Sequence, residues 1–294
     1  MDISFLIITK HRPKDIALTL SKLKSMIDTA LHEVLVFVDG CEETAMLTKN
    51  YPWVKWTISK KSISASPARN ILYKKAKGAI FIGLDDDAHP LSPNFLNTVA
   101  TTFKTHKRLG IIAFQEVRGV FNTDEEALKQ SQNRHSYFTN DFIGCGFAIK
   151  KSVYHATNGF PVWMDIYGEE AAVALQVLDV NYKILYEPSI LVNHRIDKEK
   201  RKQAGRNYYR FKRLLKNTIA FYIVYYPQPF FKIAKTLLHN LQKYAFKDWV
   251  YFKSYVSVLV YSFFRLPYLL KHRKPVKKET LALKQELQTL HYSP

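Results

Sequence analysis

The stretch Ala79-Ile-Phe-Ile-Gly-Leu-Asp-Asp-Asp-Ala-His-Pro90 joins a short apolar run directly to three consecutive acids. A run of this kind, rich in Ile, Leu and Phe, is typical of a strand that is buried on both faces of a sheet. Two similar runs precede it, at Ile3–Ile8 and at Val34–Val38. Helical signals separate the runs, so the sequence predicts an α/β fold with a mainly parallel sheet flanked by helices.

The helical signals are of two kinds. Apolar residues recur at helical spacing behind Pro13, namely at Ile16, Leu20, Leu23 and Ile27. The pairs Ser66-Pro67 and Ser92-Pro93 each place a capping serine before a proline, which favours a helix start. No glycine-rich GxGxxG or GxxxxGK[ST] motif follows any strand, so the usual dinucleotide and P-loop phosphate sites are absent.

Composition excludes several classes of protein. With 294 residues, 47% hydrophobic and 14% aromatic, the chain can bury a proper core and is not a disordered or low-complexity protein. Two cysteines, Cys41 and Cys145, are too few for a disulfide-built secreted scaffold. The first residues, MDISFLIITK, lack the basic start and long apolar run of a signal peptide. We therefore expect a cytoplasmic protein.

Acids follow two of the predicted strands at their carboxyl ends. Asp39 ends the second apolar run, and Asp85, Asp86 and Asp87 follow the third. In sheets of this type ligands bind at the carboxyl ends of the strands, and oxygen-rich clusters suit Mg²⁺ or Mn²⁺. Taken alone, the acids also fit a solvated acidic turn, and Asp39-Gly40 fits an ordinary turn pair. Their position favours a divalent-metal site.

Four blocks of sequence together resemble a known family. The blocks are SFLIITKHRPKDIALTLSKL (4–23), EVLVFVDGCEE (33–43), SPARNILYKKAKGAIFIGLDDDAHP (66–90) and NGFPVWMDIYGEEAAVALQVLDVNYKILYEPSILVNH (158–194). In this order they resemble the signature blocks of family 2 glycosyltransferases with the GT-A fold. The resemblance implies a metal-dependent, inverting transfer of sugar from a nucleoside-diphosphate sugar, by family resemblance a UDP-sugar. The acceptor would be a hydroxyl of a glycan or lipid-linked molecule, in cell-surface polysaccharide synthesis.

The resemblance also assigns roles to residues of the first three blocks. It implies that Thr9, Arg12 and Arg69 contact the nucleotide and that Asp39 binds its base. Asp85 and Asp87 fill the two acidic places of the DxD motif. Asp87 would ligate Mn²⁺ or Mg²⁺ together with Asp85, while Asp85 or Asp86 approaches the ribose. His194 matches a terminal family histidine that can complete the metal shell, although a histidine after a strand is more often a core or capping residue.

The fourth block carries the expected chemistry. Family members usually have Glu-Asp or Asp-Asp where this chain has Glu169-Glu170, and the second acid is the general base, which here is Glu170. Glutamate in place of aspartate lengthens the side chain by one methylene and so changes the reach of its carboxylate. A catalytically inactive relative of the family is therefore an alternative. Two acids can also simply decorate the start of a helix, where the dipole favours negative charge. On the acceptor side we expect Gly144, Gly146 and Trp163.

Charge divides the chain into two parts. Residues 195–294 hold 22 Lys and Arg against 5 Asp and Glu, whereas residues 1–194 are nearly balanced. We therefore expect a catalytic domain at 1–195, with a nucleotide-sugar part at about 1–115 and an acceptor part at about 116–195. A basic, aromatic, helical region follows at 196–294. Such a region indicates an anionic partner, either nucleic acid or a membrane surface.

The basic region also carries an amphipathic pattern. One helical face is apolar, with Ile233, Leu237, Leu241, Tyr244, Phe252, Val256 and Leu259. The opposite face is basic, with Lys232, Lys235, His239, Lys243 and Lys247. The longest uncharged stretch nearby, Ser254 to Phe264, is too short to cross a bilayer. Because a nucleic-acid binder has no use for the acid clusters, we expect no nucleic acid and predict peripheral association with an anionic membrane, at its cytoplasmic face.

Overall fold

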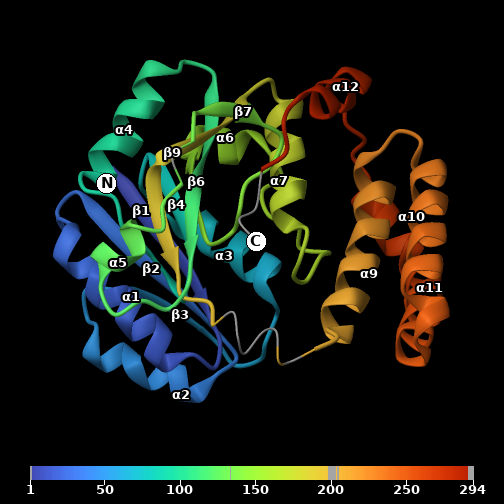
Figure 1. The fold of residues 1–294 in the computed structure, drawn as a ribbon, viewed down its shortest axis with the longest axis horizontal. Coiled ribbons are helices and arrows are strands. Elements are labelled where there is room, and N and C mark those ends of the chain that lie inside the picture. The colour runs from blue at the N-terminus through green and yellow to red at the C-terminus, as the bar shows by residue number, and fades with distance from the viewer. Residues whose placement is uncertain (1, 133, 198–202, 204, 291–294) are drawn as a thin grey trace.

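The centre of the molecule is a mixed, mainly parallel sheet. A computed structural model describes residues 2–132, 134–197, 203 and 205–290. The sheet has nine strands in the order β3-β2-β1-β4-β8-β6-β9-β5, with β7 pairing off this path to β9 (Figure 1). Neighbours among β1 to β4 are parallel, as are β6 and β9, while β5, β7 and β8 run antiparallel to their partners. The strands are β1 (Ile3–Thr9), β2 (His32–Asp39), β3 (Lys55–Ser59), β4 (Ile80–Asp85), β5 (Ala88–Pro90), β6 (Leu109–Arg118), β7 (Tyr137–Thr139), β8 (Gly146–Lys150) and β9 (Lys183–His194).

Helices cover both faces of the sheet, as the sequence predicts. Apolar residues of α1 and α4 share one core cluster with Phe5 and Ile7 of β1. Residues of α3, α6 and α7 share the other cluster with Leu6, which points to the opposite face because side chains alternate along a strand. The helices of this part are α1 (Pro13–Met26), α2 (Glu42–Ala45), the 3₁₀ helix η1 (Met46–Asn50), α3 (Ala65–Lys75), α4 (Phe95–Thr105), α5 (Asp124–Leu128), α6 (Lys151–Ala156) and α7 (Glu169–Asp179).

Two helix starts differ from the prediction. α3 begins at Ala65, and Ser66 lies inside its first turn, where its buried hydroxyl donates to the carbonyl of Pro161 at 2.7 Å. α4 begins at Phe95, after Asn94 with a left-handed backbone (φ 57°). Because a serine hydroxyl can satisfy a distant carbonyl as well as its own helix, a Ser-Pro pair locates a helix start only to within a few residues.

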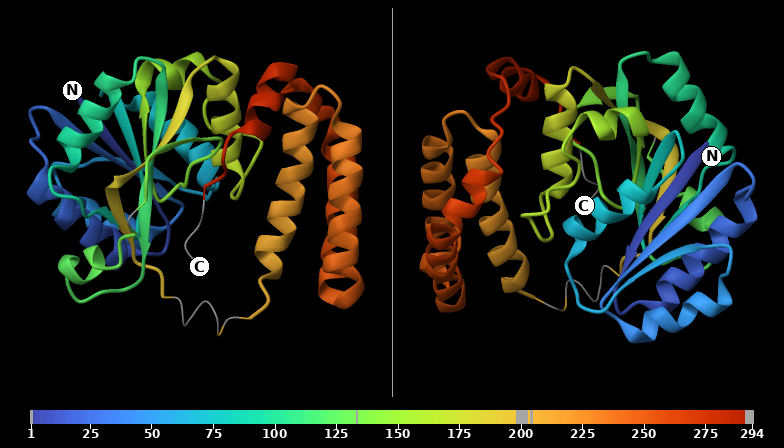
Figure 2. Two further views of the ribbon diagram at one scale, coloured as in Figure 1. Left: turned by 45° about the horizontal axis from the view of Figure 1, so that its top comes forward. Right: turned by 180° about the vertical axis from the view of Figure 1, so that it is seen from behind.

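The C-terminal region forms a helical layer beside α7. α9 and α11 stand side by side at the flank of the sheet domain (Figures 1 and 2). Apolar residues of α9 pack against Ala172 and Leu175 of α7, so the layer shares a core with the sheet domain. Its elements are α9 (Tyr208–Tyr225), α10 (Pro229–Lys243), the 3₁₀ helix η2 (Ala245–Lys247), α11 (Trp249–Lys271) and α12 (Lys278–Glu286).

The predicted continuous apolar face is wrong in two respects. The chain turns at η2, and Asp248 caps α11 by accepting hydrogen bonds from the backbone N–H groups of Val250 and Tyr251. Most of the predicted apolar residues, moreover, pack against the core of the helical layer instead of facing outward; these are Ile233, Leu237, Leu241, Tyr244, Phe252 and Leu259. Of that predicted face, Val256 is exposed. The face expected to meet a membrane therefore holds the helices together.

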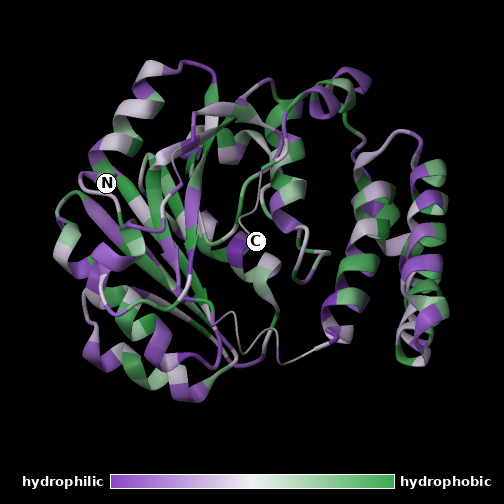
Figure 3. Cartoon of the chain, viewed as in Figure 1, coloured by the Kyte–Doolittle hydropathy of each residue, from purple (hydrophilic) through white to green (hydrophobic). Residues whose placement is uncertain are grey.

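A different set of side chains faces outward. Six aromatic residues of α10, η2 and α11 are each at least 65% exposed, and they are Phe230, Phe231, Phe246, Trp249, Phe263 and Phe264. We refer to this set as the outer aromatic surface. Figure 3 shows hydrophobic and hydrophilic residues alternating along α9 and α11. Among the helices in the described part of the chain, none combines the length and apolar character needed to span a membrane.

The end of the described chain returns to the sheet domain. The Thr139 hydroxyl donates to the carbonyl of Gln288 at 2.8 Å, and the Asn140 side-chain amide donates to the carbonyls of Lys284 and Leu287. Leu290 is buried in the core on that face of the sheet. The helical layer is therefore anchored at both of its ends, through α9 and through this returning segment.

Candidate active site

A large cavity opens at the carboxyl ends of β1, β2 and β4. Its volume is about 920 Å³. The parallel pairing of these strands brings their last residues to one edge of the sheet, since Thr9 pairs with Val38 and Ile8 with Asp85. The cavity is lined by most of the residues that the sequence singles out, namely Thr9, Arg12, Asp39, Arg69, Asp85, Asp86, Asp87, Gly144, Glu169, Glu170 and His194.

Two residues expected on the acceptor side are not among those that line the cavity. Gly146 lies in β8, where an added Cβ would come within 2.6 Å of Val192. Trp163 packs against Tyr225 of α9, with ring centroids 5.9 Å apart. Gly144 does line the cavity, and an added Cβ there would lie 2.2 Å from Oε1 of Glu170. The missing side chain at Gly144 thus gives room to the predicted base.

Asp85, Asp87 and His194 form a group with the chemistry of a metal site. Each offers one ligand atom, and these atoms lie within 4.8 Å of one another. His194 Nε2 is 3.2 Å from Asp87 Oδ1 and 4.0 Å from Asp85 Oδ2. His194 Nδ1 lies 2.5 Å from Glu116 Oε1, and this contact orients the ring so that Nε2 faces the two aspartates.

The three consecutive acids have different environments. Burial, opposed by Arg12, raises the pKa of Asp86 to about 7. Burial also acts to raise the pKa of Asp87, but the His194 imidazole and the Arg12 guanidinium outweigh it and lower that pKa. Asp87 is therefore the better anionic ligand. Its Oδ1 is buried and lies 3.2 Å from Nε2 of His194, so this oxygen and this nitrogen are close enough to share one cation.

Arg69 connects the acids of the metal group to those of α7. Its Nη1 donates to Oε1 of Glu169 at 3.1 Å and to Oε1 of Glu170 at 2.7 Å, and its Nη2 donates to Oδ1 of Asp85 at 3.0 Å. The guanidinium is buried, so the three carboxylates neutralise it in a low-dielectric environment. Its donors face carboxylates in this structure, and the expected contact with a nucleotide stays a prediction.

The two glutamates at the start of α7 are not equivalent. Glu169 is 2% exposed, and burial together with the neighbouring Glu170 raises the pKa of its carboxyl well above the usual range. Its Oε2 has no hydrogen-bond partner among the described residues. The side chain of Glu170 is 20% exposed and reaches the cavity. Glu170 is therefore the member of the pair that a substrate can reach.

Asp39 and Thr9 lie on the side of the cavity assigned to the nucleotide. The Asp39 carboxylate accepts hydrogen bonds from the Ser62 hydroxyl and from the backbone N–H groups of Ile63 and Ser64. These bonds fix its orientation. The Thr9 hydroxyl is buried beside the Asp86 carboxyl, and it acts to lower the pKa of that carboxyl against the effect of burial.

The structure adds lining residues that the sequence analysis missed. Asp141 lies in the loop before Gly144, and burial, opposed by Lys284 of α12, raises the pKa of its carboxyl to about 6. Glu116 is at the end of β6, and it had no signal because β6 lies outside the four family-like blocks. A further part of the wall comes from α9, with Tyr209, Arg210, Arg213 and Leu214.

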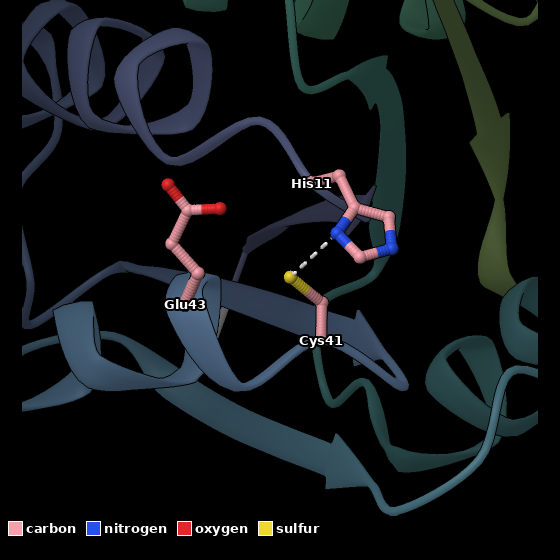
Figure 4. Close-up of side chains that lie close together, drawn as sticks. All are labelled: His11, Cys41 and Glu43. Atoms are coloured by element: carbon pink, nitrogen blue, oxygen red, sulfur yellow. Dashed lines mark hydrogen bonds between the residues drawn. The ribbon is translucent and has the colours of Figure 1, made fainter.

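Another group of side chains whose atoms lie close enough to hold a metal ion joins two loops near the cavity. Figure 4 shows His11, Cys41 and Glu43, and the Cys41 thiol lies 3.3 Å from His11 Nδ1. Cys41 also contacts the Thr44 hydroxyl at 3.3 Å, so its sulfur is already engaged within the protein. The contact ties the loop after β1, which carries Arg12, to the loop that follows Asp39 at the end of β2.

Comparisons with known proteins identify the fold. No family model matches the sequence, and neither does any curated protein sequence. Among solved structures, GalNAc-T7 with UDP, GalNAc and Mn²⁺ is similar with a TM-score of 0.61 at 15% identity, over 83% of this chain and 50% of that chain, so this chain spans half its length.

Two further solved structures match nearly all of this chain. The S. aureus protein TarS (residues 1–349) in complex with UDP-GlcNAc has a TM-score of 0.59 at 14% identity, over 96% of this chain and 84% of that chain. The mannosyltransferase PcManGT of Pyrobaculum calidifontis, with GDP-Man and Mn²⁺, has a TM-score of 0.57 at 14% identity, over 96% and 83%. At this identity the likeness shows the fold alone, and this chain has the GT-A-like fold of these proteins.

Proposed function

We propose that this protein is a metal-dependent, inverting glycosyltransferase of the family 2 type. It moves a sugar from a nucleoside-diphosphate sugar, preferably a UDP-sugar, to a hydroxyl of a glycan or lipid-linked acceptor in cell-surface polysaccharide synthesis. The observation that carries the proposal is the presence in one cavity of a metal-ligating group and an accessible carboxylate, joined by Arg69. Nucleotide-sugar donors and Mn²⁺ in proteins of the same fold support the donor class.

The metal-ligating group fits a divalent cation. Asp85, Asp87 and His194 provide two oxygens and one nitrogen, a set that Mn²⁺ accepts readily and Mg²⁺ less so. The Glu116 contact behind His194 is the feature expected of a ligand with an outer shell. When bound, such a cation neutralises the charge that develops on a departing nucleoside diphosphate.

Glu170 supplies the acid–base chemistry in this proposal. Its carboxylate accepts the proton of the acceptor hydroxyl as that oxygen attacks the anomeric carbon, a contribution of about 10²–10⁴-fold in rate. The hydrogen bond from Arg69 fixes the position of the carboxylate, and the absence of a side chain at Gly144 leaves room for it there. A single in-line displacement inverts the anomeric centre and needs one base and no covalent intermediate. On the donor side, Arg12 and the Thr9 hydroxyl are placed to bind the nucleotide.

We expect UDP to stabilise the protein only when Mn²⁺ or Mg²⁺ is present. The physical reason is that diphosphate oxygens cannot approach Asp85 and Asp87 without a cation between them. At about 100 times its dissociation constant, a ligand specific for the folded state adds about 2.7 kcal/mol to the free energy of unfolding. Thermal unfolding with a panel of nucleoside diphosphates, with Mn²⁺ or in excess EDTA, measures this effect.

Asp87→Ala is the matched variant for that experiment. It removes one proposed ligand while relieving repulsion among the acids, so the fold should persist and the metal-dependent part of the stabilisation should disappear. Equal stabilisation by UDP in EDTA would eliminate the metal from the proposal. Unchanged metal dependence in Asp87→Ala would assign the cation to other residues.

We also propose that the helical layer holds the enzyme at the cytoplasmic face of an anionic membrane. The outer aromatic surface offers exposed apolar rings, and the surrounding region carries a large excess of Lys and Arg. Aromatic side chains enter the headgroup layer, while lysines attract anionic lipid. Charge complementarity therefore favours a membrane as the occupant. Nucleic acid is the competing partner for such a surface.

Replacing Phe263 and Phe264 together by Ser should weaken binding to anionic vesicles. The lost part of the affinity should be the same at low and at high salt, because it comes from apolar burial. Burial of one such ring contributes on the order of 1.5–3 kcal/mol. The matched control is Met46→Ser with Val120→Ser, since both residues are 68% exposed but lie in the sheet domain. Co-sedimentation with vesicles of phosphatidylglycerol and phosphatidylcholine measures the difference.

Charge reversal at Lys235, Lys243 and Lys247 separates the electrostatic part of the same interaction. Each lysine near an anionic surface contributes about 1 kcal/mol, and salt screens this part. We expect the triple variant to lose the salt-sensitive fraction of vesicle binding without a change in UDP affinity. Failure to bind anionic vesicles at low salt, combined with tight binding of RNA or DNA, would identify the region as a nucleic-acid element.

A further inference from the structure

One wall of the candidate active site is built by the helical layer. Tyr209, Arg210, Arg213 and Leu214 of α9 line the same cavity as Glu170 and the metal-ligating group. The cap of α9 is Asn207, whose side chain accepts a hydrogen bond from the backbone N–H of Arg210, so the first turn of the helix is fixed. These residues belong to the region 196–294, which the sequence predicts to bind a membrane, and the family resemblance gives them no role at the site.

This wall carries unneutralised positive charge. The Arg210 guanidinium lies 5.2 Å from the ring centre of Tyr167, is exposed, and has no carboxylate partner among the residues that the structure describes. Arg213 and Lys216 both bind one carboxylate, that of Asp165. Around Arg69 the balance is reversed, because its single cation serves three carboxylates. The α9 side of the cavity therefore presents cationic charge, and Lys10 adds a further cation elsewhere in the lining.

The position of the wall relates it to the acceptor. Asp165 and Tyr167, which contact the arginines of α9, belong to the loop that leads directly into Glu169 and Glu170 at the start of α7. A base takes a proton only from a group within hydrogen-bond reach, so the acceptor hydroxyl must lie beside Glu170. The rest of the acceptor then extends toward neighbouring parts of the wall, of which α9 is one.

We propose that Arg210, supported by Arg213 and Tyr209, binds a phosphate group of the acceptor. This inference rests on the proposed function and adds the chemical class of the acceptor to it. A guanidinium presents paired N–H donors that match phosphate oxygens, and stacking on Tyr167 leaves its edge available to a ligand. The phosphate can belong to a sugar phosphate or to the headgroup of a lipid, and both present the same group to Arg210.

The test is binding of a hexose 1-phosphate to the protein saturated with UDP and Mn²⁺, measured by calorimetry. Saturation blocks the donor site, so the probe reports on the remaining cavity. We expect the hexose phosphate to bind and the free hexose to bind far more weakly. Arg210→Gln should lower the affinity for the hexose 1-phosphate by about tenfold or more without changing the affinity for UDP. The matched control is Lys212→Gln, which removes an exposed cation of the same helix that does not line the cavity.

A parallel titration with a short-chain phosphatidylglycerol below its micelle concentration separates the two sources of phosphate. Arg210-dependent binding of either probe supports the phosphate subsite, and the tighter probe identifies the source. The proposal is overturned if Arg210→Gln behaves like Lys212→Gln with both probes, or if it weakens UDP as strongly as the probes, since the wall would then serve the donor. If the wild-type protein does not bind UDP with Mn²⁺, the proposed function fails and the subsite falls with it.

Discussion

Replacing Glu170 by Gln should reduce sugar transfer by about 100-fold or more while leaving the affinity for UDP nearly unchanged. Glutamine keeps the size of the side chain, and its amide oxygen can still accept the Arg69 hydrogen bond, but it cannot take the proton of the acceptor hydroxyl. The loss of an interaction that is made only in the transition state lowers kcat and kcat/KM equally. Steady-state kinetics with a UDP-sugar, together with UDP binding, measure both parts of this expectation.

Glu169→Gln is the control that the chain itself provides. Glu169 is adjacent, binds the same arginine and is buried with a raised pKa, so its loss should have the smaller effect on transfer. Near-normal turnover in Glu170→Gln with a large loss in Glu169→Gln would move the base to the neighbouring residue. No transfer by the wild-type protein with any nucleotide sugar, despite normal UDP binding, would favour a catalytically inactive relative.

The sequence predicts those parts of the fold that are encoded locally. Buried parallel strands appear as short apolar runs, so β1, β2 and β4 and the acids at their ends could be found without a structure. Strand β8 could not, because it enters the sheet antiparallel between β4 and β6, and nothing local in its sequence specifies those partners. The Asp85, Asp87 and His194 group is a tertiary result of this sheet order and was accessible only through family resemblance.

The amphipathic pattern of the C-terminal region predicts its helices but not the surfaces that their apolar faces contact. The periodicity of residues 232–259 correctly indicates apolar helix faces, but periodicity does not say what covers such a face. In this chain most of that face packs inside the helical layer, and the exposed rings lie elsewhere on the same helices. The same limit applies to Arg210, because a charge run in sequence does not distinguish a solvated helix face from the wall of a cavity.

The side chain of Glu170, longer by one methylene than the aspartate of the family pattern, is accommodated next to Gly144. The sequence places Gly144 on the acceptor side, and the structure brings Gly144 against the Glu170 carboxylate. The extra methylene of Glu relative to Asp therefore occupies space that a Cβ at position 144 would fill. The substitution that raised doubt about activity is matched by a glycine on the opposing loop.

Replacing Arg69 by Met should destabilise the protein by about 3–5 kcal/mol, the usual effect of removing one partner from a buried ion pair. Methionine retains much of the volume of the side chain, so the loss isolates the charge. Three carboxylates, on Asp85, Glu169 and Glu170, would then face one another without a cation. Urea denaturation in EDTA measures the free energy of unfolding without any contribution from bound metal.

Lys22→Met is the matched control, because Lys22 forms a single ion pair with Asp124 in which both side chains are more than one third exposed. Exposed pairs contribute about 0–1 kcal/mol, so the control should lose little stability.

The two variants, Arg69→Met and Lys22→Met, should also differ in the pH dependence of their stability. A buried carboxyl that cannot ionise in the folded state binds more protons there than in the unfolded state, so its cost grows as the pH rises. Arg69 acts to lower the pKa of Glu169, which burial raises to about 8, so removal of Arg69 raises this pKa further. The deficit of Arg69→Met should therefore shrink as the pH falls from above about 8 to below it, and adding Glu169→Gln should restore part of the deficit at the higher pH. A deficit no larger than that of Lys22→Met, and independent of pH, would show that water rather than Arg69 compensates the carboxylates, and that the link between the metal-ligating group and the base carries no energy.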